Sequence, residues 1–375
     1  MKIAYLCEFS AGIDGVWNRI YNIAKHLSKK HDVYVLSSDI EKGSEKKAKA
    51  FEVLDGIKIF RFPTYFRFGE NALFWNYKQR IQKIKPDIIH AHVFRHPHST
   101  TACKIAKEIG ARCFLTTHAP FVESELRSSS LNIAVNIYDR FLSKNILNSY
   151  DKVIAITKWE IPFLSKLGCK KENISYIPNG MPEEFLEKTI KHSGKNQKTI
   201  LFLGRIAPIK NVELLIEVFK NLLDKGLKVK LKLVGQVERE YCNFLLSLTK
   251  KLKLTKKEVE FTGPIYELKK KVKVLQDSDI FVLPSKREAS PQALIEAMAL
   301  GKVVISSSTL GAKEFIKDKI NGFLFSNKKD LENKLEYALA NFTKFTALRK
   351  SARKTVMQLS WKRLAEQELR LYTKS

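Results

Sequence analysis

The sequence predicts an α/β protein with two domains, each built on a doubly wound, largely parallel sheet. Short apolar runs alternate with longer amphipathic segments along both halves of the chain, which is the pattern of strand–helix–strand units. The 375 residues suffice for two domains of ordinary size, and the alternation breaks only once. We therefore expect domains at residues 1–180 and 198–358, a linker at 181–197, and a C-terminal helix at 359–375 that crosses back to the first domain.

The apolar run at the start of the sequence is too short for a signal peptide. It is better interpreted as a buried first strand at Ile3–Cys7. Similar runs downstream predict strands, and the amphipathic segments between them predict crossover helices. The further strands are Val33–Ser37, Ile57–Phe62, Asp87–Ala91, Cys113–Thr117 and Val153–Ile156, and the helices are Val16–Lys29, Asn71–Lys83, Ser99–Ile109 and Leu131–Asn148. Ligands of such sheets bind at the carboxyl ends of the strands.

The alternation breaks near Ile177-Pro-Asn-Gly180, and the polar, lysine-rich stretch that follows predicts the linker. A second series of apolar runs predicts strands at Thr199–Leu203, Lys230–Val234, Val259–Thr262, Ile280–Leu283 and Val303–Ser306. Two similar domains of this kind would face each other across a cleft at their strand ends. The amphipathic segment around Trp361–Tyr372 predicts the helix that crosses back.

Composition limits the classes of function. The sequence is 44% hydrophobic and 28% charged, and no apolar run reaches about 18 residues, so we expect a soluble globular protein without a membrane-spanning helix. The five cysteines are scattered, odd in number and without metal-like spacing, which favours the reducing cytoplasm. A net charge of +28 requires an anionic partner: nucleic acid, an anionic membrane face or a phosphorylated substrate.

The stretch from Pro284 to Gly301 predicts an anion-binding site. A buried strand, Ile280–Leu283, ends at Pro284, and Ser290 and Pro291 suit the N-cap and first residue of a helix that stops at Gly301. Free backbone N–H groups at a helix start favour phosphate. Glu288 and Glu296 would be unpaired carboxylates there and would repel phosphate, so we expect them to face sugar and ribose hydroxyls. A sugar nucleotide is the ligand that this suggests.

Two cations follow the first strand of the second series. Arg205 comes directly after Gly204, and Lys210 lies five residues later, before the next amphipathic segment. A guanidinium fork and a point charge at the carboxyl end of a strand suit a diphosphate.

Together these motifs resemble glycosyltransferase family 4, the retaining, sugar-nucleotide-dependent enzymes of GT-B fold. The resemblance rests on Leu203-Gly204-Arg205 with Lys210, Ile177-Pro-Asn-Gly180, Pro284-Ser285 with Glu288, Glu296-Ala-Met-Ala with Gly301, and Val303-Val-Ile305, and it covers nearly the whole chain. It implies two Rossmann-like domains. It also implies transfer of a hexose-type sugar from a donor such as a UDP- or GDP-sugar, without a cofactor.

The resemblance implies roles for individual residues. Arg205 and Lys210 would grip the donor diphosphate and stabilise the leaving nucleotide, Glu296 would hold the ribose hydroxyls, and Glu288 would contact the donor sugar near its reacting centre. The catalytic positions would be Glu288, His118, Arg205 and Lys210. Further donor-binding positions would be Gly204, Ala289 and Ser290 in the second domain, and Gly12 and Gly15 in the first. Gly12 to Gly15 would line the diphosphate pocket, and His118 would contact the transferring sugar. No metal is implied, since cations and helix ends neutralise the phosphates.

Three motifs depart from the family pattern. The family often has Gly-Phe-Gly where this chain has Ala289-Ser290-Pro291, Lys-Gly where it has Lys210-Asn211, and Gly-Gly where it has Asp14-Gly15. These departures concern the identity of the donor more than the fold. We expect a front-face retaining mechanism in which the departing phosphate helps take the acceptor proton, with a covalent intermediate on Glu288 as the alternative.

Other motifs admit competing interpretations. Asp277-Ser-Asp279 matches a metal-binding motif of a different glycosyltransferase fold, but it lies at the amino end of a strand and favours turn chemistry. The histidines at 90, 92, 96 and 98 invite a zinc site, but their spacing favours a loop lining the cleft or acceptor pocket. The aromatic and arginine residues of 60–77 suit either a core strand and helix or contact with a lipid surface.

The leading interpretation is a cytoplasmic enzyme, peripheral on the inner face of the membrane, that acts on a lipid-linked or glycan acceptor. A GT-B epimerase or phosphorylase is an alternative, and a basic nucleic-acid-binding protein is another. The lysines are dispersed and no nucleic-acid recognition motif is visible, so no specific nucleic acid is expected.

Overall fold

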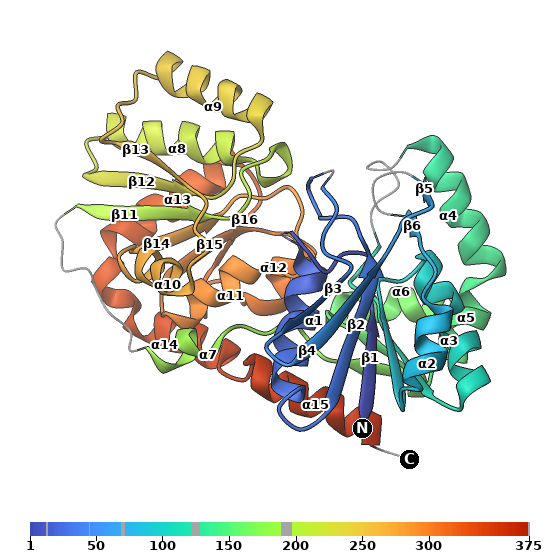
Figure 1. Ribbon diagram of the computed structural model, residues 1–375. Helices are drawn as coiled ribbons and strands as arrows, with labels where there is room; N and C mark the ends of the chain where they lie inside the picture. The colour runs from blue at the N-terminus through green and yellow to red at the C-terminus, as the bar shows by residue number, and fades with distance from the viewer. Residues whose placement is uncertain (13, 45, 69–71, 122–127, 189–196, 374–375) are drawn as a thin grey trace. The chain divides into compact units, whose positions relative to one another are not determined.

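The computed structural model describes residues 1–12, 14–44, 46–68, 72–121, 128–188 and 197–373. The chain forms two compact units, one of Met1–Gly180 with Trp361–Ser375 and the other of Met181–Ser360. Each is an α/β unit with helices packed against a central, mostly parallel sheet (Figure 1). The prediction of two Rossmann-like domains is therefore confirmed.

The sheet of the first unit has the strand order β10-β9-β8-β7-β1-β2-β4-β3, and its neighbours run parallel except β3, which is antiparallel to β4. Its strands are β1 (Lys2–Leu6), β2 (Asp32–Ser38), β3 (Phe51–Leu54), β4 (Ile57–Phe62), β7 (Ile88–His92), β8 (Arg112–Thr116), β9 (Lys152–Ala155) and β10 (Ile174–Tyr176). The helices are α1 (Gly15–Leu27), α2 (Lys78–Ile84), α3 (Pro97–Ile109), α4 (Ser129–Phe141), α5 (Ser143–Ser149), α6 (Ile161–Lys166) and α15 (Trp361–Thr373), with short 3₁₀ turns at Lys158–Glu160 (η2) and Lys171–Asn173 (η3).

Side chains point alternately to the two faces of the sheet along each strand, so the first unit has a hydrophobic core on each face. β1 sends Ile3 and Tyr5 to one face of the sheet and Ala4 and Leu6 to the other. The first face packs against α1 and the C-terminal helix α15, whose Trp361 is fully buried. A helix from the far end of the sequence thus completes a core that the first strand begins.

One element of the first half differs from the prediction. Residues of the expected helix Asn71–Lys83 form β6 (Ala72–Phe74), which pairs with β5 (Phe66–Phe68) in an antiparallel hairpin, and α2 begins only at Lys78. Asn71 lies outside the described residues. Aromatic residues favour strands, so the aromatic run here forms a hairpin that places Phe66 opposite Phe74.

The sheet of the second unit has the order β13-β12-β11-β14-β15-β16, with all neighbours parallel. Its strands are β11 (Lys198–Leu203), β12 (Val229–Val234), β13 (Val259–Gly263), β14 (Ile280–Leu283), β15 (Val303–Ser307) and β16 (Phe323–Phe325). The helices are α7 (Glu183–Glu187), α8 (Val212–Asp224), α9 (Arg239–Lys251), α10 (Leu268–Gln276), α11 (Gln292–Ala299), α12 (Leu310–Phe315), α13 (Lys328–Ala340) and α14 (Thr346–Val356), with 3₁₀ turns at Pro208–Lys210 (η4) and Phe342–Phe345 (η5).

The segment expected to be a linker, 181–197, begins with structure that belongs to the second unit. Phe185 of α7 is fully buried in the core of that unit, and Met181 N donates to Leu359 O at 2.7 Å. Burial of an aromatic side chain fixes these residues on the unit, in contrast to the polar character that predicted a linker. Residues 189–196 lie outside the described part of the chain. Among the described residues, no helix is long and apolar enough to cross a membrane.

Candidate active site

The second unit has a topological switch point between β11 and β14. β12 and β13 follow β11 toward one edge of the sheet. β15 and β16 follow β14 toward the other edge. Ligands of open α/β sheets bind beside such a point, at the carboxyl ends of the strands. The two loops that leave these ends, 204–211 and 284–291, are joined by a hydrogen bond from Lys286 N to Ile209 O at 2.9 Å.

An ion pair lies between these two loops. Lys210 Nζ is 2.6 Å from Glu288 Oε1, and Ser285 Oγ donates to the same oxygen at 2.7 Å. The side chains of Lys210 and Glu288 are 21% and 10% exposed, so the pair is partly shielded from water but open to a ligand. Asn211 follows with φ +54°, a left-handed conformation that asparagine tolerates better than most residues.

The expectation that Glu288 and Glu296 are unpaired is wrong. Glu296 on α11 is buried, and Lys271 Nζ of α10 lies 2.7 Å from its Oε1. Burial explains the pairing of both carboxylates, because an isolated charge away from water is costly. Glu296 Oε2 is also buried and has no hydrogen-bond partner among the described residues. This oxygen of Glu296 therefore has unused hydrogen-bonding capacity.

The start of α11 also differs from the prediction. Pro291 occupies the N-cap position and Gln292 begins the helix, whereas Ser290 and Pro291 were expected at these two positions. Pro291 provides no side-chain acceptor, so no side chain caps the first turn. Gly301 has the expected left-handed conformation at the other end, with φ +63°.

Gly311 is a site residue that the sequence motifs did not indicate. Its N–H donates to Glu288 O at 3.0 Å, and a Cβ added there would lie 2.6 Å from the carbonyl oxygens of both Glu288 and Ala289. Only glycine allows α12 to approach the Glu288–Ala289 loop this closely. A glycine ten residues after Gly301, where the expected helix stops, carries no recognisable spacing signal, so only the structure shows it.

The loop after β11 presents Arg205 to solvent. Arg205 Nη1 is 3.1 Å from Glu238 Oε1, and both side chains are well exposed. Gly204 precedes it, and a Cβ added at Gly235 would lie 1.7 Å from Gly204 O, so the loops after β11 and β12 are in backbone contact. The structure brings Lys210 and Glu288 together, whereas it pairs Arg205 with a different acid.

The first unit has its own switch point, between β1 and β7. His96 Nδ1 lies 2.5 Å from Glu8 Oε1 across it, a pair that sequence reasoning missed because the two residues are 88 positions apart. Gly12 has φ +82°, and its added Cβ would lie 2.4 Å from Lys42 O, so the glycine is required by close packing of two loops. Ile13 lies outside the described residues. Gly15 begins α1, and Asp14 caps this helix by accepting from Trp17 N at 2.9 Å.

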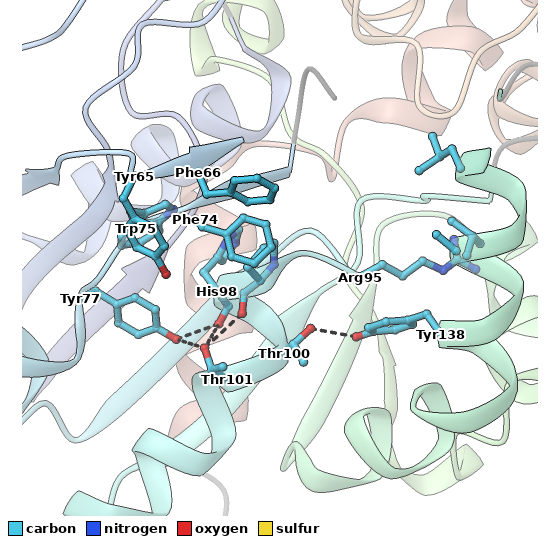
Figure 2. Close-up of a pocket in the computed structure, with 14 residues that line it drawn as sticks. Tyr65, Phe66, Phe74, Trp75, Tyr77, Arg95, His98, Thr100, Thr101 and Tyr138 are labelled. Carbon is cyan, nitrogen blue, oxygen red and sulfur yellow. Dashed lines mark hydrogen bonds between the residues drawn. The ribbon is translucent and has the colours of Figure 1, made fainter. Parts of the chain in front are cut away.

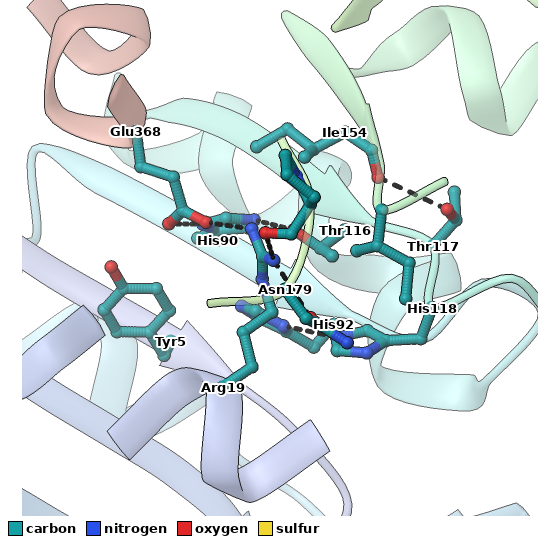
Figure 3. Close-up of polar contacts among 12 residues, drawn as sticks. Tyr5, Arg19, His90, His92, Thr116, Thr117, His118, Ile154, Asn179 and Glu368 are labelled. Carbon is teal, nitrogen blue, oxygen red and sulfur yellow. Dashed lines mark hydrogen bonds and ion pairs between the residues drawn. The ribbon is translucent and has the colours of Figure 1, made fainter. Parts of the chain in front are cut away.

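His118 follows β8 in a left-handed conformation, with φ +58°. Its Nε2 lies 2.8 Å from His92 Nδ1 (Figure 3), and burial, aided by the charge of Arg19, lowers the pKa of His118 well below its usual value. The imidazole is therefore neutral near pH 7 and can exchange a hydrogen bond with a sugar hydroxyl.

The carboxylate of Glu160 holds the loop that carries His118. It accepts from Thr117 Oγ1 at 2.8 Å and from Ala119 N at 2.9 Å, on either side of the histidine. Burial raises the pKa of Glu160 to about 7 although these hydrogen bonds favour the charged form. The left-handed backbone of His118 is thus held by a buried acid.

A buried polar network connects α15 to the same region (Figure 3). Arg19 of α1 donates to Glu368 Oε1 at 2.6 Å and to Pro178 O at 2.7 Å, and both charged side chains are fully buried. Tyr372 donates to Glu368 Oε2 at 3.1 Å and lies 2.5 Å from His90 Nδ1. The rings of His90 and His92 are 4.4 Å apart, so the network reaches the partner of His118.

The acidic motif at 277–279 and the histidine cluster at 90–98, which invited metal-site interpretations, have structural partners. Asp279 Oδ2 accepts from Thr199 N at 2.9 Å, at the amino end of β14. His90 and His98 are buried and hydrogen-bonded to Thr116 Oγ1 and His92 O, respectively. Within the described ranges, no group of three or more histidine, cysteine or acidic residues is arranged to hold a metal ion.

Comparison with protein families matches both halves of the chain. Residues 13–185 match the model described as Glycosyltransferase Family 4, and residues 184–355 match the model described as Glycosyl transferases group 1. An uncharacterized glycosyltransferase of Methanocaldococcus jannaschii is 26% identical over 339 residues, which cover 86% of this chain and 84% of the relative.

Two further proteins are similar over most of the chain. The Escherichia coli UDP-Gal:alpha-D-GlcNAc-diphosphoundecaprenol alpha-1,3-galactosyltransferase is 26% identical over 290 residues, covering 72% of this chain and 71% of the relative. The crystal structure of Anabaena HepE in complex with UDP-glucose matches with a TM-score of 0.75 at 18% identity, covering 99% of this chain and 98% of the other, which shows the fold. The matched families and the two Rossmann-like units together show that the chain belongs to the family 4-type glycosyltransferases of GT-B fold.

Proposed function

We propose that the protein is a retaining, metal-independent hexosyltransferase. It moves a hexose-type sugar from a UDP- or GDP-sugar to a lipid-linked or glycan acceptor. The observation that carries the proposal is the partly shielded Lys210–Glu288 pair at the switch point of the second unit. An ammonium and a carboxylate this close, at the carboxyl ends of the strands, can bind different parts of a sugar nucleotide. The cation can contact a phosphate, and the acid can accept hydrogen bonds from sugar hydroxyls.

The roles of the other residues follow from their available atoms. Glu296 Oε2 lacks a partner among the described residues and can accept a ribose hydroxyl. Arg205 is exposed and its pair with Glu238 is a weak surface contact, so the guanidinium can exchange that acid for a diphosphate oxygen. In the first unit, neutral His118 offers a hydrogen bond to the transferring sugar, while Gly12 and Gly15 are the positions proposed beneath the diphosphate.

The chemical step that we propose conserves the anomeric configuration. The bond between the anomeric carbon and the diphosphate oxygen breaks, and the acceptor oxygen forms its bond to the same face of that carbon. The acceptor proton passes to the departing phosphate, whose negative charge Lys210 and Arg205 stabilise. Glu288 is held by Lys210 and Ser285, which favours a positioning contact with the sugar over attack as a nucleophile.

The acceptor and the location of the enzyme are part of the same proposal. The Escherichia coli relative is named for a diphosphoundecaprenol-linked acceptor, which supports a lipid-linked one here. The charge of +28 supports peripheral binding to the anionic inner face of the membrane. Tyr65 and Phe66 of the 60–77 segment are well exposed, which supports lipid contact at these two residues.

A panel of UDP- and GDP-sugars tests this function. Release of free nucleotide should depend on an acceptor mixture of lipid-linked and free glycans, and NMR of the product should show the anomeric configuration of the donor. Acceptor-independent conversion of the donor sugar would indicate an epimerase, and dependence on inorganic phosphate would indicate a phosphorylase. Turnover should persist in EDTA, whereas loss that Mg²⁺ or Mn²⁺ restores would contradict metal independence.

Substitutions test the residues. Lys210→Ala and Glu288→Ala should each reduce turnover by at least 100-fold, because each removes a group proposed to touch the donor. Lys328→Ala is the matched control, since it breaks an ion pair of similar length, 2.7 Å to Glu217, in the same unit. Lys328→Ala should keep the unfolding midpoint within a few degrees, and the other two variants should remain folded at the assay temperature, which thermal unfolding checks. Wild-type turnover in the first two variants would contradict the assignment.

A further inference from the structure

The first unit contains a groove lined mostly by aromatic and aliphatic side chains (Figure 2). Its volume is about 630 Å³, within the range of roughly 300–1,000 Å³ typical of small-molecule sites. The hairpin β5–β6, the start of α3 and one side of α4 form its walls. The aromatic residues that line it are Tyr65, Phe66, Phe74, Trp75, Tyr77 and Tyr138.

Hydrogen bonds fix the polar residues of the groove. Tyr77 OH lies 2.8 Å from Thr101 Oγ1 and donates to His98 O at the same distance, and Tyr138 OH lies 3.0 Å from Thr100 Oγ1 (Figure 2). These contacts hold the aromatic rings in place, so the groove is formed before a ligand arrives. Tyr65 and Phe66 at its rim are 70% and 54% exposed.

Two nitrogen atoms of groove residues lack hydrogen bonds. Trp75 is 5% exposed and His98 is 2% exposed, and neither Trp75 Nε1 nor His98 Nδ1 has a partner among the described residues. A buried polar atom without a partner destabilises the folded protein, because it has given up its hydrogen bonds to water. The two rings are near each other, with centroids 5.7 Å apart. A ligand that reached both atoms would remove two such penalties.

The chemistry of the two atoms is complementary. Trp75 Nε1 carries a hydrogen and can only donate. His98 Nε2 donates to His92 O at 2.7 Å, and burial lowers the pKa of His98 to about 4, so the ring is neutral and Nδ1 can only accept. The missing partner is therefore a group that accepts one hydrogen bond and donates another. A hydroxyl does both, whereas a hydrocarbon chain does neither.

We propose that this groove binds a pyranose ring of the acceptor, with one ring hydroxyl between Trp75 Nε1 and His98 Nδ1. The inference rests on the proposed function, since it names where the acceptor of that reaction sits. The apolar C–H face of a pyranose suits the aromatic walls, and its hydroxyl rim supplies the missing hydrogen bonds. Both nitrogens are buried in the wall of the groove, so the atoms that cover them must move to admit the hydroxyl.

The groove is joined to the loop that carries His118. Arg95 lines the groove, donates to Pro120 O at 3.2 Å, and is held by Asp139 of α4 through bonds of 2.8 and 2.6 Å. Pro120 lies two residues after His118. A ring bound in the groove is thus adjacent to the edge of the sheet where His118 is expected to meet the donor sugar.

Saturation-transfer NMR with methyl glycosides of glucose, galactose, N-acetylglucosamine and N-acetylgalactosamine tests the inference on the full chain, with n-decanol as an apolar probe. At least one glycoside should bind saturably, and Trp75→Phe, which keeps a ring but removes the N–H, should weaken it about five- to tenfold. Trp159→Phe, a substitution outside the groove, is the matched control and should leave binding unchanged. Tyr65→Ala, at an exposed rim position, should weaken binding several-fold without affecting folding.

Three outcomes would overturn the inference: no glycoside binds, binding is unchanged in both groove variants, or n-decanol binds and displaces the glycoside. The unfolding midpoint of Trp75→Phe is measured first, and if this variant is misfolded the Tyr65→Ala result decides. Binding of UDP or GDP to the wild-type protein is measured separately by thermal shift. Nucleotide binding without glycoside binding refutes the groove assignment alone, whereas absence of both nucleotide binding and transfer refutes the proposed function.

Discussion

The ion pair of Arg19 and Glu368 gives a prediction whose size follows from burial. Both side chains are fully buried, and the guanidinium also donates to Pro178 O and to Asn179 Oδ1 at 3.1 Å. Arg19→Met leaves Glu368 without its cation in a site away from water. Removing one partner of a buried pair typically costs about 3–5 kcal/mol. For a domain of roughly 150–250 residues, this corresponds to a fall in the unfolding midpoint of about 10 °C.

Urea unfolding followed by tryptophan fluorescence measures this loss selectively. All four tryptophans, Trp17, Trp75, Trp159 and Trp361, belong to the first unit, so their emission reports on the unit that contains the pair. Lys58→Met is the control, because it breaks the exposed pair with Asp32 in the same unit. The control should change stability by less than about 1 kcal/mol.

The pH dependence distinguishes a charge effect from loss of packing. Burial raises the pKa of Glu368, and the charge of Arg19 opposes this rise, so Arg19→Met should raise the pKa further. The folded variant then binds a proton that the unfolded chain releases, and its stability should fall as pH increases from 5 to 8. Arg19→Met/Glu368→Gln should recover stability at pH 8. A loss under 1 kcal/mol, or one that is independent of pH and not recovered by the double substitution, would refute the reasoning.

Other substitutions probe the two switch points. Gly311→Ala should reduce turnover at least tenfold, because the added Cβ would displace the backbone of Glu288. Gly15→Ala should leave folding intact, because its Cβ would meet nothing within 4 Å. Wild-type turnover in Gly311→Ala would contradict the close approach. Glu160→Gln should flatten the pH dependence of unfolding. Since burial raises the pKa of Glu160 from 4.5 to about 7, the wild-type protein should lose about 3 kcal/mol as pH rises through this interval, and an unchanged pH profile in the variant would exclude this role.

Sequence patterns predicted most of the parallel strands to within one or two residues, because a buried strand needs a continuous apolar run and both sheets are buried on two faces. The short parallel strands β10 and β16, at the edges of the two sheets, were not predicted. The prediction at Ile280–Leu283 coincides with β14. The hairpin β5–β6 was missed because aromatic residues fit a helix face and a strand pair equally well in sequence. Local pattern therefore predicted most of the parallel strands but missed the hairpin, β3 and the two three-residue edge strands.

The candidate site was only partly predictable, for a different reason. The Lys210–Glu288 pair joins residues that motifs singled out, but the lysine at 271 that neutralises Glu296 carries no motif. The contact of His90 with Tyr372 spans 282 residues. Hydrogen bonds between segments this far apart depend on which strands and helices become neighbours, and hydrophobic periodicity and short motifs do not reveal this.

Where this chain lacks a glycine that the family often has, the residues present still suit the local backbone. Asn211, where the family often has glycine, has a left-handed conformation that asparagine tolerates, and Asp14 caps α1 where the family has the first of two glycines. The loop of Ala289 and Ser290 has no glycine of its own. The glycine that allows close packing here is Gly311 of α12, which lies against the carbonyl groups of Glu288 and Ala289. We therefore expect a difference in donor choice to come from side chains rather than from the backbone of these loops. Those of Ala289 and Ser290 are the first to examine, since they follow the acid proposed to hold the sugar.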